Sequence, residues 1–144
     1  MKKILTLLFV GLITFFTTLN AEETSEKKIH KVVIQVSTDD LRTQKIALNN
    51  AVNLQKLYGL DNVEIEIVAF GPGLNLLTSK SNQNKRVESL ALQDISFSAC
   101  TNSIKKVEKK TGSKVVLLEG VQKVTAGVAR IIELQEDGYS YIRP

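Results

Sequence analysis

The feature that most constrains the fold of this chain is the alternation of short apolar runs with longer amphipathic segments. Apolar runs of strand length occupy residues 32–36, 63–70, 95–99, 115–118 and 139–142. Between them, residues 41–58, 85–93, 102–110 and 126–137 carry apolar side chains at the helical spacing of three and four. Strands that alternate with helices predict βαβ units. We therefore expect one α/β domain with a mainly parallel five-stranded sheet and helices on both faces.

The spacing within these segments predicts which side chains face the core. The inward stripe of the first helix consists of Ala47, Leu48, Ala51, Val52, Leu54 and Tyr58. In the last helix, Val128, Ile131 and Ile132 are expected to point inward. The alternation at Glu64 and Glu66 indicates that the second strand enters the sheet from a solvated end.

Polar or glycine-containing segments follow four of the predicted strands. They are residues 37–40, 71–73, 100–103 and 119–120. In parallel α/β sheets, binding sites form outside the carboxyl ends of the strands, so we expect these segments to gather at one edge. Asp39, Gly71, Pro72 and Gly73 would form the rim of a pocket there.

The single cysteine of the chain, Cys100, falls at the end of a predicted strand and just before a predicted helix. At that position the thiol would lie close to the N–H groups of Asn102, Ser103 and Ile104 and to the positive end of the helix dipole. Both favour the thiolate, which is the reactive form. One cysteine cannot form an internal disulfide, so Cys100 is buried and inert, paired between subunits, or reactive.

The first 21 residues have the pattern of a secretion signal. Lys2 and Lys3 precede a mostly apolar stretch, and Ala21 offers a cleavage site. We expect a signal peptide over residues 1–21, a flexible leader over 22–29 and the folded domain over 30–144, in a periplasmic or secreted protein. An uncleaved membrane anchor at the amino terminus is the alternative.

The charge of the chain does not indicate a nucleic-acid-binding protein. The formal net charge is +4, and it falls to about +2 once the two lysines of the signal are removed. The basic residues form short runs without interleaved aromatic side chains, which is typical of solvated faces.

Other chemistries are less well supported by the sequence. A cysteine hydrolase needs a base beside the thiol, but the one histidine, His30, precedes the first strand and lies roughly 17 to 20 Å away at the opposite edge. The loop at Gly71 lacks the third glycine of the dinucleotide fingerprint, because Leu76 stands in its place. Asp39 and Asp40 are expected to cap a helix rather than to bind a metal.

Five stretches carry a resemblance to a known family. They are residues 30–40 (HKVVIQVSTDD), 47–54 (ALNNAVNL), 69–74 (AFGPGL), 97–102 (FSACTN) and 134–144 (LQEDGYSYIRP). With these stretches the chain resembles the DsrE/DsrF-like family of sulfur-relay proteins, in particular its small exported members. The resemblance implies a flavodoxin-like, doubly wound fold, assembly into trimers or hexamers, and a persulfide carried on Cys100.

Two functional hypotheses follow from these observations. The first is an exported sulfur carrier or sulfurtransferase that takes sulfane sulfur on Cys100 and passes it to a partner thiol. It would need no cofactor and no metal, and its partners would be further copies of itself and a sulfur-donor or acceptor protein. The second is a non-catalytic, oligomeric α/β binding module in which Cys100 is structural.

Overall fold

Five parallel strands form one sheet at the centre of the molecule. The computed structural model describes residues 28–144, so the predicted signal peptide and residues 22–27 of the leader lie outside the described residues. The strands are His30–Val36 (β1), Val63–Ala69 (β2), Ile95–Cys100 (β3), Val121–Val124 (β4) and Ser140–Ile142 (β5). They lie in the order β4-β3-β2-β1-β5, and every neighbouring pair is parallel.

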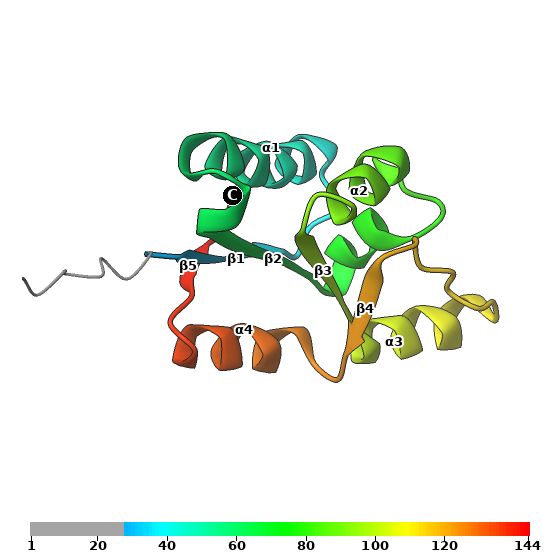
Figure 1. Cartoon of the computed structure of the whole chain (residues 1–144). Helices are drawn as coiled ribbons and strands as arrows, with labels where there is room; N and C mark the ends of the chain where they lie inside the picture. The colour runs from blue at the N-terminus through cyan, green and yellow to red at the C-terminus, as the bar shows by residue number, and fades with distance from the viewer. Residues whose placement is uncertain (1–27) are drawn as a thin grey trace, which may run out of the picture.

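Helices cover both faces of this sheet (Figure 1). The α-helices are Leu41–Tyr58 (α1), Asn84–Ala91 (α2), Thr101–Thr111 (α3) and Gly127–Glu136 (α4), and the 3-10 helices are Leu60–Asn62 (η1) and Gly71–Leu77 (η2). Figure 1 shows α1 and α2 on one face and α4 on the other, with α3 leaving the end of β3 on the same side as α4. The predicted α/β, doubly wound, flavodoxin-like fold is confirmed.

The main core lies between the sheet and the α1 side of the molecule. Ile34, Leu48, Ile67 and Phe97 are completely buried there. Full burial of such a side chain contributes about 1.5–3 kcal/mol to folding, so this layer supplies most of the hydrophobic stabilisation. A smaller cluster of Val33, Val68, Ile131 and Leu134 lies under α4.

Helix α1 begins and ends where the sequence predicts. The carboxylate of Asp40 accepts a hydrogen bond from the Thr43 N–H at 2.7 Å, so the capping interpretation of this acidic residue is confirmed. Gly59, with φ of 85°, ends the helix. Two polar residues are buried beside the predicted apolar stripe, because Gln44 donates to the Thr38 carbonyl and Gln55 to the Gln93 carbonyl.

The predicted fourth strand, residues 115–118, is wrong. This segment makes one antiparallel bridge between Leu117 and Thr78, with a hydrogen bond from the Ser79 N–H to the Val116 carbonyl, and it covers η2. The fourth strand is instead β4, where Gln122 and Lys123 are exposed. An edge strand has one neighbour and needs less apolar surface, so its sequence resembled a loop.

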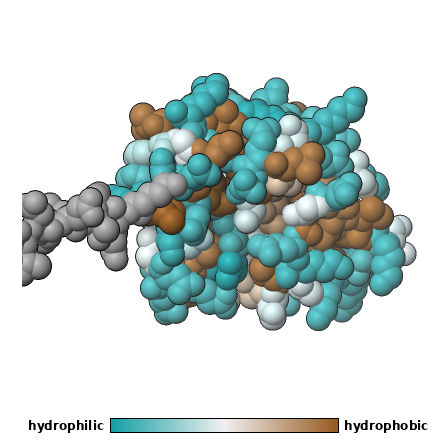
Figure 2. All heavy atoms as spheres, in the orientation of Figure 1, coloured by the Kyte–Doolittle hydropathy of each residue, from teal (hydrophilic) through white to brown (hydrophobic). Residues whose placement is uncertain are grey.

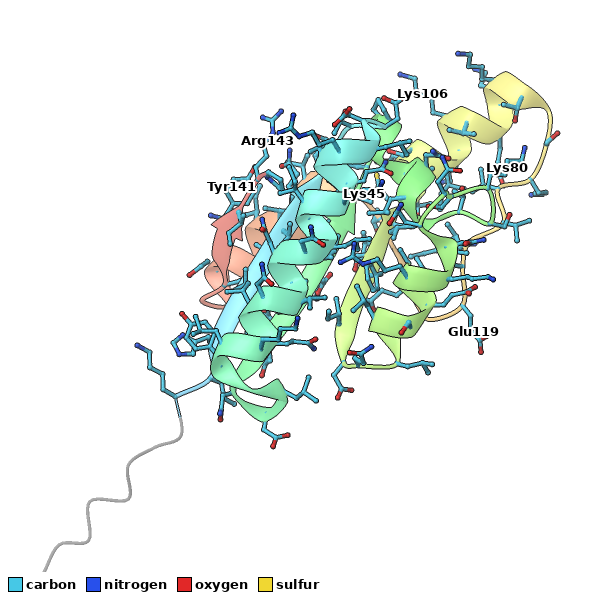
Figure 3. All side chains as sticks on the ribbon, turned by 90° about the horizontal axis from the view of Figure 1, so that it is seen from above. Lys45, Lys80, Lys106, Glu119, Tyr141 and Arg143 are labelled. Atoms are coloured by element: carbon cyan, nitrogen blue, oxygen red, sulfur yellow. The ribbon has the colours of Figure 1, made fainter. Side chains whose placement is uncertain are left out.

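This shift moves residues 119–120 away from the predicted site. They precede β4 and therefore lie toward the amino ends of the strands. In Figure 3, Glu119 lies well apart from Lys106, which belongs to α3 beyond the carboxyl edge. The sequence had placed Glu119 and Gly120 with Cys100, and that placement is corrected.

Two predicted orientations on the α4 side are also corrected. Ile131 is buried as expected, but Val128 and Ile132 are 57% and 52% exposed because the helix is rotated to bury Leu134 instead. Glu66 is 4% exposed rather than solvated, because an arginine of α4 reaches it. Within residues 28–144, no helix has both the length and the hydropathy needed to cross a bilayer.

Candidate functional site

Cys100 is the last residue of β3, and α3 begins at the next residue. Its strand lies between β2 and β4, so the cysteine is flanked by the carboxyl ends of both. The residue is 5% exposed. The sequence therefore placed Cys100 correctly at the edge of the sheet where parallel α/β folds form their sites.

Two helices begin close to this cysteine. Cys100 is the N-cap residue of α3, and α4 begins at Gly127, three residues after Val124, the residue of β4 that pairs with Cys100. Neither helix has a hydrogen bond from a capping side chain, so the N–H groups of their first turns are not taken by an oxygen acceptor. Cys100 thus lies near the positive ends of two helix dipoles.

This environment favours the thiolate of Cys100. Burial raises the pKa of the thiol, but the Ser103 hydroxyl and the N–H groups of Gly127, Ser103 and Asn102 outweigh it, and the pKa is lowered from its ordinary value. A lowered pKa increases the fraction of reactive thiolate at neutral pH.

Ser103 connects the cysteine to the loop after β2. The Gly71 N–H donates to the Ser103 oxygen at 2.8 Å, which leaves the hydroxyl proton of Ser103 for the sulfur of Cys100. Gly71 has φ of 55°, a conformation that glycine adopts without strain, and this turn directs its N–H toward α3.

The predicted residues Asn102, Ser103 and Ile104 lie in the first turn of α3, directly after Cys100. The N–H groups of Asn102 and Ser103 lower the pKa of the Cys100 thiol. The Ile104 side chain is buried in the main core. Gly127 was missed because residues 121–124, which form β4, were interpreted as a loop, so nothing in the sequence pattern placed residue 127 at the carboxyl edge.

The residues predicted to form one pocket rim lie in different places. Gly71 lies next to Ser103, but Gly73 is buried against β1, where an added Cβ would clash with the Val36 carbonyl oxygen. Asp39 is exposed after β1, two strand positions or about 10 Å from β3 across the sheet. No contact in residues 28–144 joins Asp39 to the cysteine.

Pro72 lines a groove of about 270 Å³ that runs beside α3. Leu74, Val107, Val115 and Val116 supply much of its apolar surface. Figure 2 shows apolar side chains gathered over the segment between α3 and β4, among hydrophilic neighbours. Cys100 does not line this groove.

His30 lies far from the cysteine, as the sequence predicts. It begins β1, and its ring stacks on Tyr58 with 3.8 Å between the ring centroids. A strand of this length spans about 20 Å, so a cysteine–histidine dyad within one subunit is excluded. In the part of the chain that the structure describes, no three histidine, cysteine or acidic side chains are grouped to hold a metal ion.

Comparisons with known proteins give a family and a structural neighbour. The model of the DsrE/DsrF-like family matches residues 30–144. A solved protein of unknown function from Methanobacterium thermoautotrophicum is 34% identical with a TM-score of 0.72, and the match covers 80% of this chain and 99% of that one. No curated protein matches the chain.

Proposed function

The chain belongs to the DsrE/DsrF-like family, and we propose that it is a sulfur carrier that holds sulfane sulfur as a persulfide on Cys100. Family membership supports a role in sulfur relay in general terms. The observation that carries the specific proposal is the position of Cys100 beside two helix starts, with Ser103 in the first turn of α3.

The chemistry consists of two thiol exchanges. The Cys100 thiolate attacks the outer sulfur of a donor persulfide, R–S–SH, so that a new S–S bond forms and the bond between the two donor sulfurs breaks. The products are Cys100–S–SH and the donor thiolate, R–S⁻. An acceptor thiolate then attacks the outer sulfur and releases the Cys100 thiolate. No external oxidant or reductant is needed, because each step breaks one S–S bond and forms another.

The surroundings of Cys100 suit both steps. In the first, a lowered pKa supplies the nucleophile. In the second, Cys100 is the leaving group, and the same N–H groups stabilise the thiolate that departs. A deprotonated persulfide also carries negative charge, which the starts of α3 and α4 would stabilise.

Intact-protein mass spectrometry tests the proposal. The protein is incubated with a low-molecular-weight persulfide or with polysulfide, desalted and weighed. We expect a mass increase of one sulfur atom, its loss on treatment with a thiol acceptor, and no increase in Cys100→Ala. A wild-type protein that gains no sulfur under conditions that load a control thiol would contradict the proposal.

The low exposure of Cys100 favours the alternative, a binding module with a structural cysteine. Native-state alkylation separates the two. If the thiol reacts with iodoacetamide at a rate comparable to a small-molecule thiol, a donor can reach it. If it reacts after unfolding and not before, the cysteine is structural and the carrier proposal fails.

A further inference from the structure

The most unusual feature away from Cys100 is a carboxylate buried in the middle of the sheet. Glu66 lies on β2, faces α4, and is 4% exposed next to the apolar cluster that includes Val68 and Ile131. Removing a charged carboxylate from water is costly unless the charge is paired and its oxygens are hydrogen-bonded. Such a group at this position needs a structural or functional reason.

Arg130 of α4 pairs with both oxygens of this carboxylate. Its Nε donates to Oε1 at 2.9 Å, and its second guanidinium nitrogen donates to Oε2 at 2.7 Å. The Ser98 hydroxyl also donates to Oε1, and the Gln122 side-chain amide donates to the Ser98 oxygen at 2.9 Å. The hydrogen bonds and charge of Glu66 raise the pKa of Arg130. The network therefore ties α4 to β2, β3 and β4.

The arginine of this network lies in the first turn of α4. Gly127 and Arg130 are three residues apart and so share one side of the helix. The Arg130 N–H also makes the first backbone hydrogen bond of the helix, to the Ala126 carbonyl at 3.0 Å. The pair with Glu66 consequently restrains the position and rotation of the first turn of α4, which begins near Cys100.

A second contact holds the same turn from the other side. A Cβ added at Gly127 would lie 2.8 Å from the Phe70 ring, so the helix backbone rests directly on that side chain. Phe70 follows the end of β2, the strand that carries Glu66. The start of α4 is thus held at two points by one strand, and no capping side chain helps to place it.

We infer that Glu66 and Arg130 are positioning residues that hold the start of α4 over Cys100, so that the Gly127 N–H stabilises the thiolate. This inference rests on the proposed function, since the position of Gly127 matters for activity only if the thiolate reacts. The competing explanation is that the pair merely stabilises the fold. The two explanations differ in what they predict for the acidity of Cys100 in a folded variant.

The test is the pH dependence of Cys100 alkylation by iodoacetamide in folded protein. Arg130→Met and Glu66→Gln are each expected to shift the profile to higher pH and to lower the thiolate fraction at neutral pH about two- to fivefold, the size of a helix-start interaction. Arg130→Lys keeps the charge without the two-pronged geometry and is expected to fall between wild type and Arg130→Met.

Two control variants remove other polar contacts, one on α4 and one in the segment that follows it. Glu133→Gln removes the exposed second partner of Arg130, and Tyr139→Phe removes a hydrogen bond to Glu64 beyond the far end of the helix. Both are expected to keep the wild-type profile. The charged side chains on β2, α3, β4 and α4 are Glu64, Glu66, Lys105, Lys106, Glu108, Lys109, Lys110, Lys123, Arg130, Glu133 and Glu136. Glu133 is the one charged side chain on these elements that the controls change.

A folded Arg130→Met or Glu66→Gln protein with the wild-type alkylation profile would overturn the inference. If both variants fail to fold, the test is the nitrogen chemical shift of the Gly127 amide in wild-type protein. This shift is expected to follow the titration of Cys100. The response is expected to disappear in Cys100→Ser. An amide that does not respond also overturns it. Neither measurement depends on persulfide formation. If Glu66 and Arg130 prove not to position α4, the carrier proposal is unaffected. If the protein never accepts sulfur, the alkylation profiles still show whether these two residues act on Cys100.

Discussion

The hydroxyl of Ser103 is the side-chain group that acts most directly on Cys100. It accepts the Gly71 N–H and lowers the pKa of the cysteine thiol, and it comes from the first turn of the same helix that the cysteine caps. A residue in this position lowers the pKa of the thiol but does not act as a base that takes its proton. The site is therefore built for a stable thiolate rather than for proton transfer between a cysteine and a histidine.

Replacing Ser103 with alanine should make Cys100 less acidic. A hydrogen bond to a charged group contributes about 1.5–3 kcal/mol, so we expect the pKa of Cys100 to rise and alkylation at neutral pH to slow about tenfold or more. The measurement is the pH profile of alkylation. Asn102→Ala is the matched control, because residue 102 acts through its backbone N–H and its side chain is exposed. Equal profiles for Ser103→Ala and Asn102→Ala would contradict this role.

Tyr139 should make the protein less stable at high pH. Burial and the nearby Glu64 raise the pKa of its phenol to about 12, against about 10 in an unfolded chain. Between these values the folded state keeps a proton that the unfolded state has lost, so the free energy of unfolding falls as pH rises. Urea unfolding at several pH values between 10 and 12 should show a smaller slope for Tyr139→Phe. Identical slopes would exclude the effect.

At the scale of elements, the site depends on how closely α4 approaches β2. The absence of a side chain at Gly127 lets the first turn of α4 rest on Phe70, and this contact brings a helix start to the end of β3. The neighbouring helix α3 needs no such device, because it continues directly from the cysteine. One helix is thus placed by chain connection and the other by packing.

Gly127→Ala tests this packing. The new methyl group would lie 2.8 Å from the Phe70 ring, so α4 or the ring must move, at a cost of about 1–3 kcal/mol in the free energy of unfolding. Urea unfolding measures it. The cost should be smaller when the same change is made in a Phe70→Leu background, which removes the ring. An equal cost in both backgrounds would show that the Phe70 ring is not the cause, because leucine keeps the Cβ that lies 2.9 Å from the added methyl group.

At the scale of the whole molecule, the exposed apolar side chains of α4 are a candidate surface for self-assembly. Val128 and Ile132 are one helical turn apart, and each exposes more than half of its surface. We expect wild-type protein to form trimers or hexamers and Ile132→Lys to shift it toward monomer, as measured by light scattering after gel filtration. Leu57→Lys, on α1, is the control. A monomeric wild-type protein would contradict this prediction.

Export also concerns the whole chain. Residues 1–21 are expected to be removed after Ala21, so the protein recovered from the periplasm or medium should begin at Glu22. The mass of the intact protein from fractionated cells measures this directly. A full-length protein recovered with the membrane fraction would support the uncleaved anchor instead.

The sequence by itself determined the features that depend on neighbours along the chain. Apolar periodicity predicted α1 within its observed bounds, Asp40 and Gly59 marked its ends, and the run before Cys100 placed the cysteine at the end of a strand. These features are local because helix capping and strand alternation are decided by residues a few positions apart. The same patterns were enough for the fold class.

The tertiary structure decided which segments meet. Residues 121–124 form the edge strand of the sheet, although residues 115–118 are more apolar. The more apolar run packs over η2 instead. The tertiary structure also buried Glu66 against an arginine 64 positions away and brought the start of α4 close to Cys100. Burial and pairing between distant segments depend on the free energy of packing the whole domain, and no local pattern in the sequence contains that balance.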